Sequence, residues 1–79
     1  MKIRLDKAQW VENCDTEKSY AIKFSRGAVD MTFLSKKFTT ITEVQEQDKS
    51  LSYDFEFPDW LYDKLSNKEV IKLIIKENN

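Results

Sequence analysis

Carboxylates are the only abundant side chains in this sequence that could transfer protons or hold a cation. Asp54 and Glu56 are two residues apart in an alternating segment, so both should project from one face of a strand. Asp59 and Asp63 lie one helical turn apart. Pairs of this kind can serve in hydrolysis or bind divalent cations. A solvated polar face is the more common interpretation, and we prefer it for both pairs.

The other groups that catalysis requires are missing or poorly placed. The sequence contains no histidine, and its single cysteine, Cys14, lies in an acidic loop where nearby carboxylates disfavour a reactive thiolate. One cysteine forms neither an intramolecular disulfide nor a zinc site with metal-ligand spacing. Gly27 is the only glycine, so there is no glycine-rich phosphate loop. We therefore predict that the protein is not an enzyme and uses no cofactor and no metal ion.

Charge is distributed unevenly along a chain whose formal net charge is only −1. Residues 38–63 contain seven carboxylates and one lysine, whereas residues 1–37 and 64–79 each carry net positive charge. An acidic stretch on a rigid strand and helix would complement a basic surface on a partner protein. A chance imbalance in a short chain is the plainer explanation, and the sequence does not decide between the two.

The leading functional hypothesis is a protein that binds and occludes a partner protein through this acidic surface. The candidate contact residues are Glu43, Glu46, Asp48, Asp54, Glu56, Asp59 and Asp63, with Trp60 and Tyr62 as aromatic anchors. Buried aromatic anchors often dominate the energy of protein interfaces. Packing in the core is the somewhat stronger expectation for Trp60.

Binding of single-stranded nucleic acid is the alternative hypothesis. Such proteins combine a cationic groove with aromatic platforms on which bases stack. The basic residues Lys23, Arg26, Lys36 and Lys37 flank the aromatic residues Phe24, Phe33 and Phe38. The slightly acidic net charge argues against this hypothesis, and the spacing of the aromatic residues is also typical of a strand core.

Five segments have the pattern of extended strands. They are Lys2–Val11, Lys18–Ser25, Ala28–Ser35, Phe38–Val44 and Leu51–Phe57. The last of them alternates apolar and polar residues without a fault, as a half-buried antiparallel strand requires. In the third, Val29, Met31 and Phe33 share one face, and Gly27 marks the turn before it.

The C-terminal third changes character at Pro58, which favours a short helix over Pro58–Leu65. The segment 67–77 is ambiguous. Ser66-Asn67-Lys68-Glu69 has the spacing of a helix capping box, but the residues that follow are largely β-branched. We expect a strand there, with Ile71, Leu73 and Ile75 on one face.

Together these elements predict one domain over residues 1–79 with an α+β, mainly β fold. We expect a small antiparallel sheet or open barrel of about four to six strands, with one short helix near residues 58–65. No export signal and no apolar run of membrane length are visible, so we expect a cytoplasmic protein, in a host cytoplasm if a phage encodes it. The sequence is also compatible with a homodimer.

Two segments resemble a pattern in small phage and prophage proteins. These proteins carry W-[IL]-P-K-[SK] after a short hairpin and then [IL]-P-x-W-L. Here the counterparts are Phe33–Lys37 and Phe55–Leu61, with Phe33 in place of the tryptophan and Ser35 in place of the proline. Gln9-Trp10 and Tyr20–Phe24 match the preceding part.

That family has no established activity or catalytic residues to carry over. The resemblance implies a small accessory protein of a mobile element. Proteins of this kind include inhibitors of host machinery, such as anti-CRISPR proteins, and handlers of phage DNA. This implication rests on association and not on a site.

Overall fold

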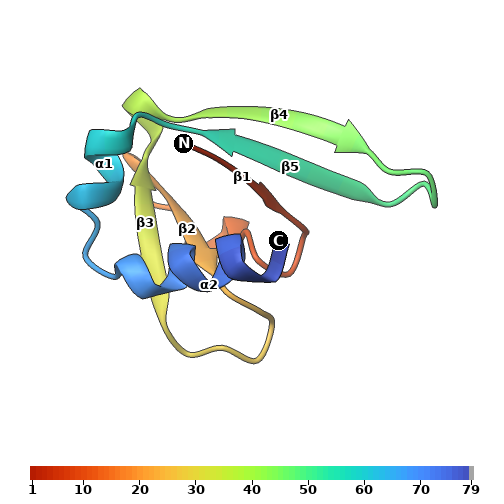
Figure 1. The fold of residues 1–79 in the computed structure, drawn as a ribbon, viewed down its shortest axis with the longest axis horizontal. Helices are drawn as coiled ribbons and strands as arrows, with labels where there is room; N and C mark the ends of the chain where they lie inside the picture. The colour runs from red at the N-terminus through yellow and green to blue at the C-terminus, as the bar shows by residue number, and fades with distance from the viewer. Residues whose placement is uncertain (79) are drawn as a thin grey trace.

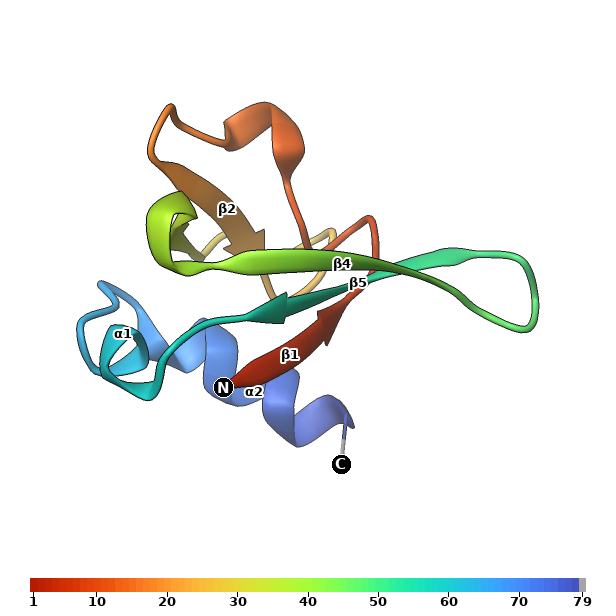
Figure 2. The same cartoon turned by 90° about the horizontal axis from the view of Figure 1, so that it is seen from above.

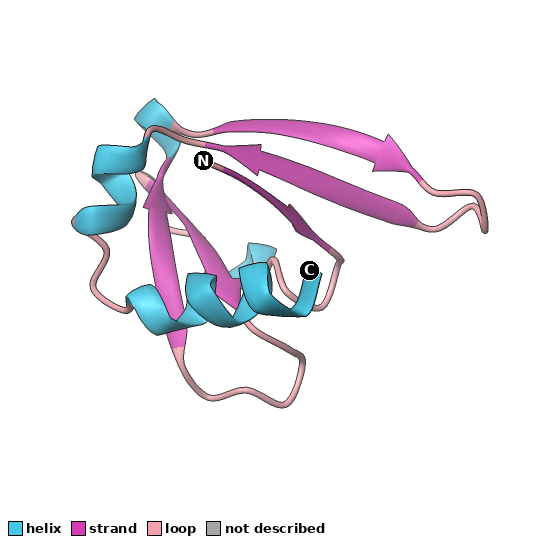
Figure 3. Ribbon diagram, in the orientation of Figure 1, coloured by secondary structure: helices cyan, strands magenta, loops and turns pink. Residues whose placement is uncertain are grey.

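The computed structural model describes residues 1–78 and contains five strands in two antiparallel sheets, two α-helices and two short 3-10 helices (Figures 1 and 3). The strands are β1 (Lys2–Leu5), β2 (Ser19–Lys23), β3 (Met31–Ser35), β4 (Thr40–Gln45) and β5 (Leu51–Glu56). The helices are η1 (Glu12–Cys14), η2 (Lys36–Phe38), α1 (Asp59–Asp63) and α2 (Lys68–Asn78). The predicted α+β, mainly β class is confirmed, and the two sheets do not close into a barrel.

The larger sheet has the order β1-β5-β4, so β5 is its central strand. Its predicted alternation is confirmed, because Phe55 is buried towards the body of the molecule while Glu56 is exposed. Phe55 lies opposite Ile3 of β1 and Ile41 of β4. Phe57, just after the strand, is also buried. The apolar face of this sheet therefore forms one wall of the core.

β4 and β5 continue past the end of β1 as a hairpin that extends from the body, as Figure 2 shows from above. Its tip is closed by backbone hydrogen bonds from Glu46 N to Ser50 O and from Lys49 N to Glu46 O. Lys49 has a positive φ of 70°, a conformation that costs a side-chain-bearing residue some strain. Asp48 offsets part of this cost by accepting hydrogen bonds from the Ser50 amide and hydroxyl.

The smaller sheet pairs β2 with β3, and the face that carries Ile22 and Leu34 packs into the core. Ile22 lies opposite Thr32, and both side chains are fully buried. Leu34 is also buried, whereas Phe33 is 38% exposed. The predicted face of Val29, Met31 and Phe33 is therefore the outer one. The register sets this orientation, because Ile22 directs the even-numbered residues of β3 inward.

The N-terminal segment is extended only as far as Leu5. Asp6 then caps a turn by accepting hydrogen bonds from the amides of Ala8 and Gln9 at 2.8 and 3.0 Å. The chain returns to pair through an isolated bridge between Trp10 and Ile22. This turn corrects the prediction of one extended segment over Lys2–Val11.

The prediction of a strand over 67–77 is wrong, because α2 is a helix. Its buried residues are Val70, Ile71 and Ile74, which share one helical face, whereas Leu73 is 39% exposed. In a strand Ile71 and Leu73 would have been buried together. The low helix propensity of β-branched residues costs a few tenths of a kcal/mol each, and burial of each isoleucine side chain returns about 1.5–3 kcal/mol.

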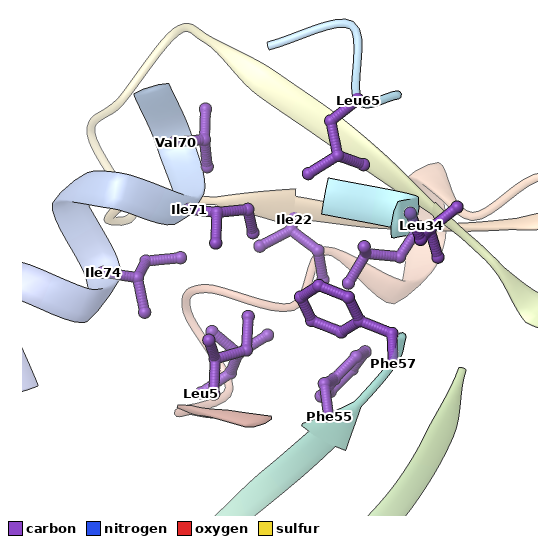
Figure 4. Close-up of a cluster of buried hydrophobic side chains, with 11 residues drawn as sticks. Leu5, Ile22, Leu34, Phe55, Phe57, Leu65, Val70, Ile71 and Ile74 are labelled. Atoms are coloured by element: carbon purple, nitrogen blue, oxygen red, sulfur yellow. The ribbon is translucent and has the colours of Figure 1, made fainter. Parts of the chain in front are cut away.

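The core lies between the larger sheet, the smaller sheet and α2. Figure 4 shows side chains from β5, β2 and α2 meeting there, with Phe55, Ile22 and Ile71 among them. α1 adds Leu61, so the short helix predicted near residues 58–65 is confirmed in place, although it spans only Asp59–Asp63 and leaves Trp60 exposed. Within residues 1–78 no helix is both long enough and apolar enough to cross a membrane.

Alanine substitutions in α2 should distinguish helical from extended packing. We expect Ile74→Ala to lower the free energy of unfolding by about 2–5 kcal/mol, because it removes a fully buried side chain. Leu73→Ala should cost clearly less, because that side chain is partly in solvent. Urea denaturation monitored by circular dichroism measures both. A larger loss for Leu73 than for Ile74 would contradict the helical packing.

Thr32→Val should stabilise the protein. The Thr32 hydroxyl is fully buried and has no hydrogen-bond partner within residues 1–78. Valine has nearly the same shape and removes the unsatisfied group, so we expect a gain of about 1 kcal/mol in the free energy of unfolding. The same denaturation measurement applies, with Thr42→Val on the exposed face of β4 as the control. A loss of stability in Thr32→Val would show that the hydroxyl has a bound partner.

Candidate functional site

The predicted acidic surface contains one carboxylate that is not at the surface. Asp54 is only 7% exposed, although it lies on the outer face of β5. It lies opposite Arg4 of β1 and Thr42 of β4. Arg4 donates two hydrogen bonds to it, Nε to Oδ1 at 2.8 Å and Nη2 to Oδ2 at 3.0 Å. This bidentate geometry is the strong form of an arginine–carboxylate pair.

The surroundings of Asp54 keep it ionised. Hydrogen bonds from Arg4 hold the pKa of Asp54 below its ordinary value, and the positive charges of Arg4 and Lys2 lower this pKa further. Burial of the carboxylate opposes them by raising the pKa. Lys2 Nζ lies 3.8 Å from Asp54 Oδ2, and Arg4 Nη1 lies 3.5 Å from Glu46 Oε1. Asp54 and Glu46 are thus engaged within the sheet, and Asp54 is removed from the candidate contact surface.

The remaining carboxylates do not form one continuous stripe. Glu43 faces the opposite side of the sheet from Glu56, because it pairs with Tyr53 while Glu56 pairs with Lys2 and Thr40. Asp48 lies at the tip of the β4–β5 hairpin, while α1 lies at the other end of the molecule (Figure 1). Only three exposed carboxylates remain close together along the chain, at the end of β5 and on α1. They are Glu56, Asp59 and Asp63.

An exposed aromatic pair lies beside these three carboxylates. Phe38 of η2 and Trp60 of α1 are 42% and 45% exposed. Their ring centroids are 4.8 Å apart and the ring planes are inclined by 76°, an edge-to-face contact. The expectation that Trp60 is buried in the core is therefore wrong, because Leu61 is the residue of α1 that packs inward.

The second predicted anchor, Tyr62, has a different role. It is half-buried and packs against the core, with Lys68 Nζ 6.0 Å from its ring centroid. Lys37 Nζ lies 5.5 Å from the ring centroid of Phe38 and so borders the aromatic pair. We call Phe38 and Trp60, with their neighbours Glu56, Asp59 and Asp63, the aromatic patch.

The four basic residues of the alternative hypothesis do not meet. Lys23 is at the end of β2, and Arg26 follows in the turn, whereas Lys36 and Lys37 lie beyond the opposite end of the smaller sheet. Since a strand rises about 3.3 Å per residue, the two pairs are separated by more than about 13 Å. Lys36 instead lies over the ring of Tyr20, with Nζ 5.3 Å from the centroid.

Lys23 and Arg26 belong to a hollow that the sequence did not reveal. It has a volume of about 520 Å³. Its lining residues are Lys7, Ala8, Trp10, Val11, Glu12, Asn13, Lys23, Arg26 and Tyr53. They come from three separate stretches of chain, 7–13, 23–26 and Tyr53, so no local motif could have identified the hollow. We call it the basic hollow.

Cys14 is exposed on η1. Among residues 1–78 no group of three or more histidine, cysteine, aspartate or glutamate side chains is arranged to hold a metal ion.

Comparison with other proteins adds no family to these observations. No family model matches the chain, no curated protein sequence matches it, and no solved structure matches its fold.

The Asp54–Arg4 pair should make stability depend on pH. The folded-state pKa of Asp54 lies below the ordinary value of 3.8. Its stabilising contribution is therefore complete above that pH and is lost as the pH falls through the lower folded-state value. At pH 7 we expect Asp54→Asn to cost about 1–3 kcal/mol, because the amide places a donor against the guanidinium.

Urea denaturation at pH values from neutral to about 2.5 measures this dependence. The difference in the free energy of unfolding between the wild type and Asp54→Asn should become smaller as the pH falls below the ordinary pKa of a carboxyl group. Asp63→Asn is the matched control, since Asp63 is exposed on α1. A difference that stays constant across the acid range would contradict the assignment.

Proposed function

We propose that this protein is a non-enzymatic binding module that docks on a partner protein through the aromatic patch. The observation that supports this most strongly is the exposure of Phe38 and Trp60 in mutual contact. Aromatic side chains carry much of the energy of protein interfaces, and tryptophan is among the residues most enriched at binding hot spots. In a small domain with a limited core, leaving two such rings in water forgoes stabilisation that burial would provide.

The position of the pair on rigid elements also favours docking. Trp60 is held by α1, whose Leu61 and the following Leu65 are buried in the core. Phe38 is held by η2, directly after β3. An anchor that is already fixed in the free protein loses little conformational entropy on binding.

The chemistry of the patch indicates what the partner surface offers. The rings would enter an apolar pocket, and the carboxylates of Glu56, Asp59 and Asp63 would face basic groups at its border. The acidic contact surface expected from the sequence is therefore reduced to the carboxylates at the end of β5 and on α1. Complementary charge of this kind mainly increases the association rate and the selectivity.

Occlusion is the mechanism that fits a chain of this size. A standard interface buries about 800 Å² on each partner, and this domain has a total accessible surface of 5420 Å². One face of the molecule would therefore cover a functional site on the partner. An accessory protein of a mobile element that inhibits a host protein, including an anti-CRISPR protein, would act in this way.

Capture from a bacterial lysate tests the proposal. We expect the immobilised wild-type protein to retain a specific partner after nuclease treatment, and Phe38→Ala with Trp60→Ala to lose it. A hot-spot pair of this kind contributes at least about 2 kcal/mol, which corresponds to a loss of affinity of roughly 30-fold.

The matched control removes exposed apolar surface elsewhere. Val29 and Leu73 are 89% and 39% exposed and lie outside the patch, so Val29→Ser with Leu73→Ser should retain the partner. Circular dichroism verifies that both double variants are folded. Equal capture by the two variants, or recovery of nucleic acid alone, would contradict docking through the patch.

A further inference from the structure

The basic hollow brings together three cationic side chains that have no ion-pair partner within residues 1–78. They are Lys7, Lys23 and Arg26. Glu12 is the one carboxylate among the lining residues, so the hollow carries a net positive charge in a chain whose net charge is −1. Like charges gathered around a concave, low-dielectric surface attract an anion from solution.

Hydrogen bonds hold the backbone near two of these residues, Lys7 and Lys23, in place. Lys7 lies in the turn that Asp6 caps, and Gln9 ties this turn to the end of β2. The amide of Lys23 donates to Gln9 O at 2.8 Å, and Gln9 Nε2 donates to Phe24 O at 2.8 Å. The backbone positions from which Lys7 and Lys23 extend are therefore fixed relative to each other before any ligand arrives, and Arg26 follows Lys23 by three residues.

Two aromatic rings line the same hollow. The ring centroids of Trp10 and Tyr53 are 5.1 Å apart, and the ring planes are inclined by 79°. The indole of Trp10 is oriented by its Nε1–H group, which donates to both carboxylate oxygens of Asp15 at 3.2 Å. Two nearly perpendicular rings can contact a planar group by stacking on one ring and by an edge contact with the other.

We propose that the basic hollow binds a nucleotide unit. The phosphate would be bound by Lys7, Lys23 and Arg26, and the base would contact Trp10 and Tyr53. A volume of about 520 Å³ lies within the usual range of small-ligand pockets. Cationic groups that contact the phosphate and aromatic rings that contact the base are the combination used by single-strand binding proteins. An acidic peptide would use the cations but would leave the rings without a planar partner.

A nucleotide unit can come from a free nucleotide or from a single strand, and the fluorescence of Trp10 can distinguish these sources. In a Trp60→Phe protein, Trp10 is the only tryptophan, so its fluorescence reports on the hollow. The probes are inorganic phosphate, thymidine, thymidine 5′-monophosphate and an oligothymidylate of about eight nucleotides. We expect the last two to quench Trp10 and to bind more tightly than phosphate or thymidine alone.

If thymidine 5′-monophosphate binds with the same affinity per site as the oligonucleotide, the ligand is a free nucleotide. Much tighter binding of the oligonucleotide identifies a single strand. Phosphate that binds as tightly as the nucleotides would overturn the proposal, as would the absence of any quenching at millimolar concentrations.

Charge reversal supplies the second test. Lys23→Glu with Arg26→Glu should weaken nucleotide binding by about tenfold or more and reduce its salt dependence. Lys64→Glu with Lys72→Glu makes the same change in net charge on exposed lysines of the C-terminal segment, outside the hollow, and should have little effect. Equal weakening by both pairs would show that only the overall charge matters and would overturn the site. The result is independent of the proposed docking, because neither Phe38 nor Trp60 lines the hollow and the Trp60→Phe substitution is the same in every arm.

Discussion

Phe55 is the side chain through which the two sheets of this protein are joined. It lies at the centre of β5 and is fully buried between Ile3 and Ile41 on the neighbouring strands. Its ring also makes edge-to-face contacts with Trp10 and Tyr20, at centroid distances of 5.3 and 5.6 Å. Tyr20 belongs to the smaller sheet. A chain of 79 residues without a disulfide depends on such contacts, because it has little other apolar surface to bury.

The same alternation that turns Phe55 inward turns Asp54 outward, and this has a functional consequence. On the outer face Asp54 meets Arg4 from the neighbouring strand and forms a bidentate ion pair with it. Lys2 and Glu46 extend the network. Around Asp54 the outer face of the larger sheet thus carries paired charges and not a continuous acidic surface. Exposed carboxylates beside exposed aromatic groups occur instead near α1, where Asp59 also pairs with the N-terminal ammonium at 3.0 Å.

Local patterns in the sequence were sufficient for elements whose periodicity has one interpretation. The alternation of Leu51–Phe57 predicted β5, and Pro58 predicted the start of α1. Local patterns were not sufficient for elements in which both faces are partly apolar. In β3, Met31 and Phe33 compete with Thr32 and Leu34, and only the pairing with β2 decides between them. In α2, propensity favoured a strand, whereas burial of one helical face against the core decided the outcome.

The candidate sites were less predictable, because the contacts that build them are far apart in the sequence. Trp60 was a functional candidate from the sequence, but its contact with Phe38 joins α1 to η2, two elements far apart in the sequence. Asp54 was placed on the acidic surface because its partner, Arg4, is 50 residues away. The basic hollow requires that the turn after β1 meets the end of β2. Charge counted along the chain could not show any of these three contacts.

The features that support a binding role include side chains that the core leaves in solvent. The core accounts for Phe55, Leu61 and Ile71, and each obeys the rule that apolar groups are buried. The exposed rings of the aromatic patch and the unpaired cations of the basic hollow follow no such rule. Departures of this kind are expected at functional sites, where stability is given up for a contact with another molecule. Because the two sites share no residue, a partner protein and a nucleotide would make separate sets of contacts with this domain.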